Sequence, residues 1–173
     1  MDRKQARAFE EFVAESGDTL LRIATLLTSD AHLAEDLYQE TLQRLAARWS
    51  RVDSPRAFCR RVMHNLVIDQ SRARQRRPRE LELFAGHDHR DPRSADHLAA
   101  VELRPALLAA LDTLSAQQRA IVVLRYFDDR SEAQVAELLG VSAGTVKSTA
   151  SRAMAQLRMQ PGLTALFAVT KTP

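Results

Sequence analysis

Little in this chain of 173 residues favours strands, tight turns or covalent cross-links. It has one cysteine, five glycines and six prolines, and aromatic residues make up only 5% of it. A single cysteine cannot form an internal disulfide, and scarce glycine and proline argue against an architecture of strands and turns. Ala, Leu, Arg, Glu and Gln are common instead, and these residues favour helices. The composition therefore predicts an all-α protein.

Long apolar runs are also missing. None approaches the roughly 18–20 residues that a membrane span needs, and no apolar segment like that of a signal peptide follows the first four residues, Met-Asp-Arg-Lys. We therefore expect a cytoplasmic protein that does not insert into a membrane. Apolar residues still make up 45% of the chain, which is enough for one ordinary core or two small ones.

Apolar residues at helical spacing dominate the first half of the chain. The expected helices cover residues 5–16, 19–28, 30–48 and 55–75. Gly17 predicts a break between the first two helices. Ser29 or Asp30 can cap the third helix, and Ser54 followed by Pro55 is a strong start for the fourth.

The positive charge is concentrated in one segment. The formal net charge is only +3, yet residues 56–79 contain eight arginines against one acid, Asp69. At 100° per residue, Arg61, Asn65 and Arg72 form a stripe beside the apolar face of the expected helix. Such a stripe suits a polyanion, although a solvated helix face remains the alternative.

A segment without periodicity divides the chain. Residues 76–96 contain Pro78, Gly86 and Pro92 among charges of both signs, and helical spacing returns at Leu98. We therefore expect two small helical domains on a flexible linker. The expected division is a domain over 1–77, a linker over 78–96, a second domain over 97–160 and a tail over 161–173. The His87-Asp88-His89 cluster in this polar linker is expected to be chance rather than a metal site.

The second half carries the signals of a helix-turn-helix. Ser115 with Gln118, and Ser131 with Gln134, have the spacing of capping boxes. Gly140 allows the left-handed turn that ends a helix, and a serine two residues later can cap the next one. Two caps around a turn glycine predict two short helices joined by a tight corner.

The last of these helices has two contrasting sides. One side is apolar, and the other carries small, hydroxyl-bearing or cationic residues. The predicted duplex-reading residues are Gly144, Thr145, Lys147, Ser148, Ser151 and Arg152. Small residues permit close approach to a major groove, and hydroxyls and cations reach phosphates and base edges. The alternative is a helical hairpin with a polar outer face.

These motifs together resemble those of a known family. Ala34-Glu-Asp-Leu-Tyr-Gln-Glu40, Pro55 through Asp69, Leu114 through Arg119, Leu124-Arg-Tyr-Phe127 and Gly144-Thr-Val-Lys-Ser148 stand in the family's order. The chain thus resembles the extracytoplasmic-function sigma factors of bacterial RNA polymerase, and is similar to the actinobacterial group named after sigma-E. The resemblance covers nearly its whole length.

The resemblance implies partners and residue roles. Core RNA polymerase would be bound by Asp36, Gln39, Glu40 and Gln43, whose alternative reading is a solvated helix face. Single-stranded DNA of the minus-ten promoter element would be bound by Arg60, Arg61, Asn65 and Arg72. The minus-thirty-five duplex would be read by the helix described above. An anti-sigma factor is a further partner that the resemblance leaves open, and no cofactor or metal is implied.

Other interpretations remain open at this point. An ordinary helix-turn-helix regulator would share the second half but not the basic helical first half, and a pure protein-interaction module would not need a groove-facing helix. No nucleophile–base pair or phosphate loop is recognisable, so we do not expect an enzyme. Trp49 suits either a core anchor or base stacking, and Asp69 lies close to the buried side by angular count. Cys59 is expected to be inert core.

Overall fold

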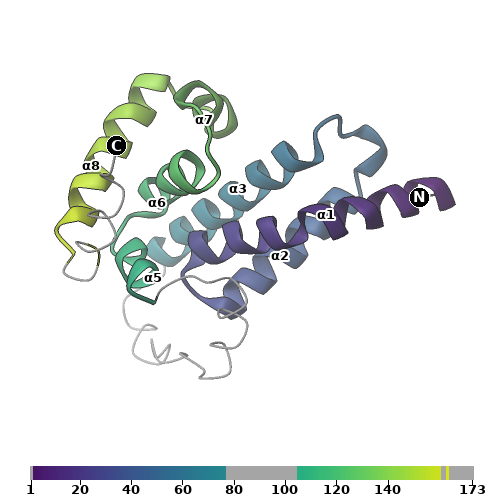
Figure 1. Cartoon of the computed structure of the whole chain (residues 1–173), viewed down its shortest axis with the longest axis horizontal. Coiled ribbons are helices and arrows are strands. Elements are labelled where there is room, and N and C mark those ends of the chain that lie inside the picture. Colours follow the sequence, from purple (N-terminus) through teal and green to yellow (C-terminus); the bar gives the residue numbers. More distant parts are fainter. Residues whose placement is uncertain (1, 77–104, 161–162, 164–173) are drawn as a thin grey trace, which may run out of the picture.

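A computed structural model describes residues 2–76, 105–160 and 163, and within them every regular element is a helix (Figure 1). The predicted all-α class is therefore confirmed. The expected linker, the His87-Asp88-His89 cluster and nearly all of the expected tail lie outside the described residues. Leu163 is the exception, and its side chain is buried.

Three long helices build the first half of the chain. They are α1 (Arg3–Thr28), α2 (Ala31–Ala46) and α3 (Pro55–Arg76), with the short 3-10 turn η1 (Trp49–Arg51) before α3. Asp30 caps α2 by accepting a 2.9 Å hydrogen bond from the Leu33 amide. Ser29, in the left-handed region at φ 58°, ends α1. Asp30 rather than Ser29 is thus the N-cap of α2, and Pro55 opens α3 as predicted.

The expected break near Gly17 is wrong, because α1 runs through it without interruption. A Cβ built on Gly17 would lie only 2.9 Å from the Tyr38 hydroxyl oxygen on α2. A glycine inside a helix usually costs stability, but here its missing side chain leaves room for a neighbouring helix to approach. Gly17 therefore has a structural role, but that role is to let α2 pack closely against α1 and not to end a helix.

The described part of the second half contains five elements: α5 (Pro105–Asp112), α6 (Ala116–Val122), the π-helical turn η3 (Val123–Phe127), α7 (Glu132–Leu139) and α8 (Ala143–Arg158). Both capping boxes are formed, since each serine caps the amide three residues later and each glutamine bonds back to its serine amide. Gly140 ends α7 at φ 66°, and Ser142 caps α8 through the Thr145 amide at 3.0 Å. The predicted helix-turn-helix is α7–α8.

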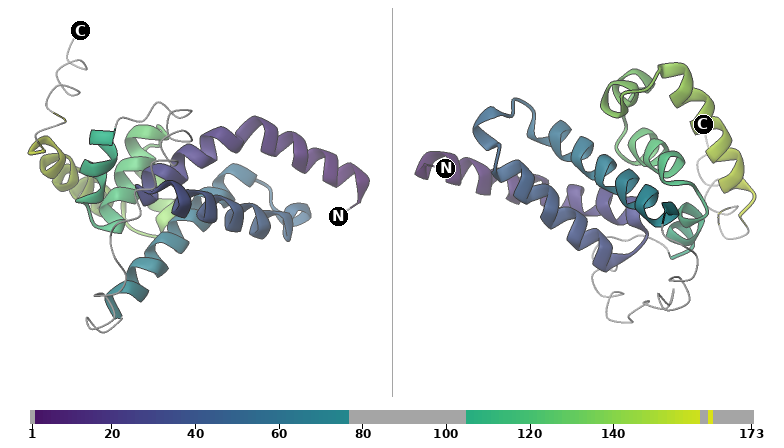
Figure 2. Two further views of the ribbon diagram at one scale, coloured as in Figure 1. Left: turned by 90° about the horizontal axis from the view of Figure 1, so that it is seen from below. Right: turned by 180° about the vertical axis from the view of Figure 1, so that it is seen from behind.

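The two halves lie against each other and share a core. Helices α6 and α7 contact α3, and α5, α6 and η3 contact α1. All three views place α6 beside α3 and α8 on the outer side, away from α2 (Figures 1 and 2). One cluster of buried apolar residues runs from Leu20 and Met63 in the first half to Leu111 and Leu157 in the second. The halves therefore form one continuous body in this arrangement.

Three residues with open interpretations are placed by the fold. Trp49 is a core anchor, since its ring lies edge-on to Phe9 with centroids 5.2 Å apart. Cys59 is fully buried, and burial raises the pKa of its thiol to about 11, which suits inert core. Asp69 is exposed on α3, so the expectation from the angular count was wrong.

Candidate functional site

The outer face of α8 is cationic and open. All six predicted duplex-reading residues on it are exposed: Gly144, Thr145, Lys147, Ser148, Ser151 and Arg152. The opposite face is held in the core by Val146, Ala150, Ala153 and Leu157. Helix α8 contains no acidic residue, so its outer face carries only positive charge at Lys147, Arg152 and Arg158. A rigid, buried inner face and a small-residue outer face suit entry into a DNA major groove.

Helix α3 presents a second basic face. Its sequence contains six arginines and one acid, Asp69. Three of the four residues predicted to bind single-stranded DNA, Arg61, Asn65 and Arg72, are exposed on it. Guanidinium and amide groups in this pattern can contact phosphates and base edges.

His64 supports this face from beneath, and sequence reasoning missed it. Its side chain is buried, and burial lowers its pKa, which favours the neutral ring. Its Nδ1 lies 3.3 Å from Oδ1 of Asn65. A neutral ring that bonds one edge of the Asn65 amide orients that amide. In the sequence, the signal for this role is a histidine that directly precedes the asparagine in the expected helix.

Arg60, the fourth predicted strand-binding residue, is not on the open face. Its side chain is 6% exposed and pairs with Asp128, which is 5% exposed and follows η3. Arg60 Nη2 donates to Asp128 Oδ1 at 2.6 Å, and Nε donates to Oδ2. Arg130 donates to the same Oδ2 at 3.0 Å. Asp128 was not singled out from the sequence, because its partner lies 68 residues away.

Arg119 makes a second connection between the halves. It is largely buried, and its Nη1 donates to the Leu27 carbonyl at 3.2 Å and the Ser29 hydroxyl at 3.3 Å. Its Nη2 bonds Asp112 Oδ1 at 2.9 Å within its own half. A cation at the carboxyl end of α1 complements the negative end of the helix dipole. Arg119 thus ties α6 to the end of α1.

The predicted polymerase-binding stripe on α2 is mostly open. Asp36, Gln39 and Gln43 are exposed. Glu40 is half-buried, and its Oε1 accepts a 2.6 Å bond from Arg44 one turn further on. The stripe is therefore presented as expected, with one of its two carboxylates already paired within the helix.

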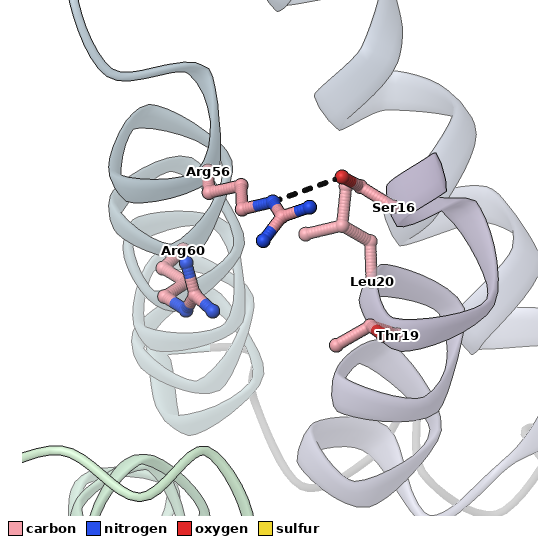
Figure 3. Close-up of a pocket in the computed structure, with 5 residues that line it drawn as sticks. All are labelled: Ser16, Thr19, Leu20, Arg56 and Arg60. Atoms are coloured by element: carbon pink, nitrogen blue, oxygen red, sulfur yellow. Dashed lines mark hydrogen bonds between the residues drawn. The ribbon is translucent and has the colours of Figure 1, made fainter. Parts of the chain in front are cut away.

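A small cavity lies between α1 and α3, next to the buried arginine (Figure 3). It is lined by Ser16, Thr19, Leu20, Arg56 and Arg60, and Arg56 Nε donates to Ser16 Oγ at 3.0 Å across it. Its volume is about 60 Å³, while one water occupies about 30 Å³ in the liquid. It therefore has room for water.

No three His, Cys, Asp or Glu side chains gather in a metal-binding group within residues 2–76, 105–160 and 163. In the same part of the chain, no helix is long and apolar enough to cross a membrane.

Comparison with known proteins gives one family match in each half of the chain. Residues 12–77 match the family described as Sigma-70 region 2, and residues 104–157 match Sigma-70, region 4. The RNA polymerase sigma-E factor of Streptomyces coelicolor is 39% identical over 155 residues, which cover 87% of this chain and 84% of that protein. The ECF RNA polymerase sigma factor SigL of Mycobacterium tuberculosis is 33% identical over 155 residues, or 84% of each chain.

Solved structures of other proteins share this fold. The sigma factor RpoE of Bartonella quintana, in complex with the anti-sigma factor NepR, superposes with a TM-score of 0.67 at 25% identity, over 88% of this chain and 95% of that one. CnrH, in complex with the cytosolic domain of CnrY, gives a TM-score of 0.57 at 25% identity, over 95% and 90%.

This chain therefore belongs to the RNA polymerase sigma factors of the extracytoplasmic-function type, and is similar to sigma-E. It directs promoter-specific transcription initiation by binding core RNA polymerase and promoter DNA.

Proposed function

We propose that three exposed surfaces divide this activity among them. The stripe Asp36, Gln39, Glu40 and Gln43 binds core polymerase. The exposed face formed by Arg61, Asn65 and Arg72 binds single-stranded DNA of the minus-ten element, and Arg60, which is buried in this arrangement, contributes to the same binding. The outer face of α8 reads the minus-thirty-five duplex. The observation that carries the proposal is that each surface is an open polar face on a helix whose other side is held in the core.

The electrostatics of the three surfaces support this assignment. The α2 stripe offers carboxylates and amides, which suit a basic protein surface. Helices α3 and α8 offer arginine, lysine and hydroxyl groups, which suit a polyanion. In the described residues of α3, Asp69 is the only acid among six arginines, so little within the helix offsets its field.

Several further assignments belong to the same proposal. The working units are residues 1–77, the linker 78–96, residues 97–160 and the tail 161–173. The chain acts by binding and not by catalysis, in the cytoplasm where the polymerase works. An anti-sigma factor is proposed as an additional partner, because the structural neighbour RpoE was solved in complex with one.

A charge reversal tests the polymerase surface. Asp36→Lys should weaken binding to core polymerase at least about tenfold, because a like charge placed in a complementary interface costs several kcal/mol. The matched control is Glu10→Lys, an equally exposed reversal on α1. Affinity is measured by fluorescence titration with core enzyme, and transcription on a promoter library is measured alongside. Equal affinity of the two variants would remove the α2 stripe from the proposal.

A further inference from the structure

The contact between the two halves hides one residue of the proposed DNA-binding machinery and leaves the rest open. Arg61, Asn65, Arg72 and the outer face of α8 are exposed, whereas Arg60 is 6% exposed and is covered by the segment after η3. The α2 stripe is also uncovered. This arrangement can therefore meet polymerase, but it cannot offer Arg60 to DNA.

The cover is specific in its chemistry. Both carboxylate oxygens of Asp128 are engaged by Arg60, and Arg130 shares one of them. Bidentate pairing in a buried setting is geometrically demanding, and losing one partner leaves an uncompensated buried charge. Arg119 fastens the same interface at the end of α1. Two separate polar contacts thus hold the halves together around their shared apolar cluster.

The closed arrangement also carries a cost. Arg60 Nη1 is buried and has no hydrogen-bond partner among the described residues. A buried donor without a partner is unfavourable compared with one that reaches water or a phosphate. Separation of the halves would expose this donor to water or to a phosphate.

We propose that the Arg60–Asp128 pair is an autoinhibitory latch, which withholds Arg60 from single-stranded DNA in the free protein and opens when the two halves separate on the polymerase. The proposal rests on the proposed function of the α3 face. It implies an order of events in which the open α2 stripe docks first and strand binding becomes available afterwards.

The test uses the full chain with Asp128→Asn, which removes the charge that holds Arg60 without altering Arg60. The matched control is Asp129→Asn, which makes the same chemical change at the next, exposed residue. Asp129 has a φ of 50°, a conformation that asparagine tolerates well. Because both variants gain one positive charge overall, a general electrostatic effect on DNA binding cancels in the comparison.

Two quantities are measured without polymerase: the radius of gyration by small-angle X-ray scattering, and binding of a fluorescein-labelled single-stranded DNA of random sequence by anisotropy. Wild type and Asp129→Asn should scatter as the closed body. Asp128→Asn should expand and bind the DNA about tenfold more tightly or better, because apparent affinity rises with the fraction of open molecules. Arg119→Gln, which loosens the other contact, should expand the protein as well.

Far-UV circular dichroism shows whether each variant keeps its helices. If Asp128→Asn loses its helices, Arg119→Gln replaces it in the test. Identical scattering and identical DNA affinity for all folded variants would overturn the latch. Transcription with core polymerase separates the two ideas: if all variants transcribe but none expands, the latch fails and the proposed function stands. If wild type does not support transcription at all, the proposed function fails instead.

Discussion

Gly17 offers a quantitative test of how α1 and α2 are held together. In Gly17→Ala the added Cβ would lie 2.9 Å from the Tyr38 hydroxyl oxygen, whereas the ring carbon Cζ and the Val13 Cγ1 are both 4.0 Å away. The hydroxyl is therefore the one atom in the way, and it is the outermost atom of its side chain. Removing it with Tyr38→Phe leaves only ordinary van der Waals contacts around the new methyl group.

Two opposing effects set the magnitude. Replacing an interior helical glycine with alanine stabilises a helix by about 1 kcal/mol. Moving the Tyr38 ring out of contact offsets part or all of this gain, because overpacking a helix contact typically costs about 1–3 kcal/mol and a mobile ring lies at the low end. Gly17→Ala alone should therefore be near neutral. In the Tyr38→Phe background it should stabilise by about 1 kcal/mol, which raises Tm by about 2–4 °C.

The measurement is a double-mutant cycle from urea denaturation, with thermal unfolding as a second readout. Tyr38→Phe alone supplies the remaining corner, so any effect of losing the hydroxyl itself is subtracted. We expect a coupling free energy of about 1 kcal/mol between the two positions. The same gain from Gly17→Ala in both backgrounds would refute the close approach. Since Tyr38 lies on α2 beside the stripe proposed to bind polymerase, the cycle also reports how that helix packs against α1.

Two further predictions concern DNA. Lys147→Ala should weaken binding to all duplexes and flatten the salt dependence of binding, as loss of a phosphate contact does. Arg152→Ala should instead relax the preference at one base pair, where a bidentate contact is worth about 1–3 kcal/mol. Equal losses of affinity for promoter and random duplexes in Arg152→Ala, measured by anisotropy, would show that Arg152 contacts the DNA backbone. Ala substitutions at Arg61 and Asn65 should impair strand opening more than formation of the closed complex. Permanganate footprints of melted thymines report strand opening. If the closed complex fails to form, both residues act in duplex docking instead.

Local signals in the sequence were enough for much of the fold. The capping boxes at Ser115 and Ser131, the proline that opens α3 and the left-handed Gly140 are all found as predicted. Each depends on hydrogen bonds or backbone preferences within a few residues, so the sequence pattern contains the whole cause. The exposed face of α8 follows from the same logic, because four buried residues at helical spacing leave the other side in solvent.

The errors have a common origin in contacts between distant segments. The low helix propensity of glycine predicts a break at Gly17, yet a tyrosine on α2 decides the role of this residue. The basic run that holds Arg60 and Arg61 suggests one open surface for both, yet Arg60 is buried against Asp128. Its row along the helix, with Met63, His64 and Val67, is buried, and that row was the available clue.

By itself, the sequence determined the helices, the helix-turn-helix and the charge of the faces, because periodicity and capping act over one or two turns. Only the tertiary structure decided which arginine of α3 meets solvent and which meets an aspartate 68 residues away. Placing a charge in the interior is favourable only with a partner in the right position, and no local pattern specifies that partner. The contact that hides Arg60 is thus a property of how the two halves lie together, and of neither half alone.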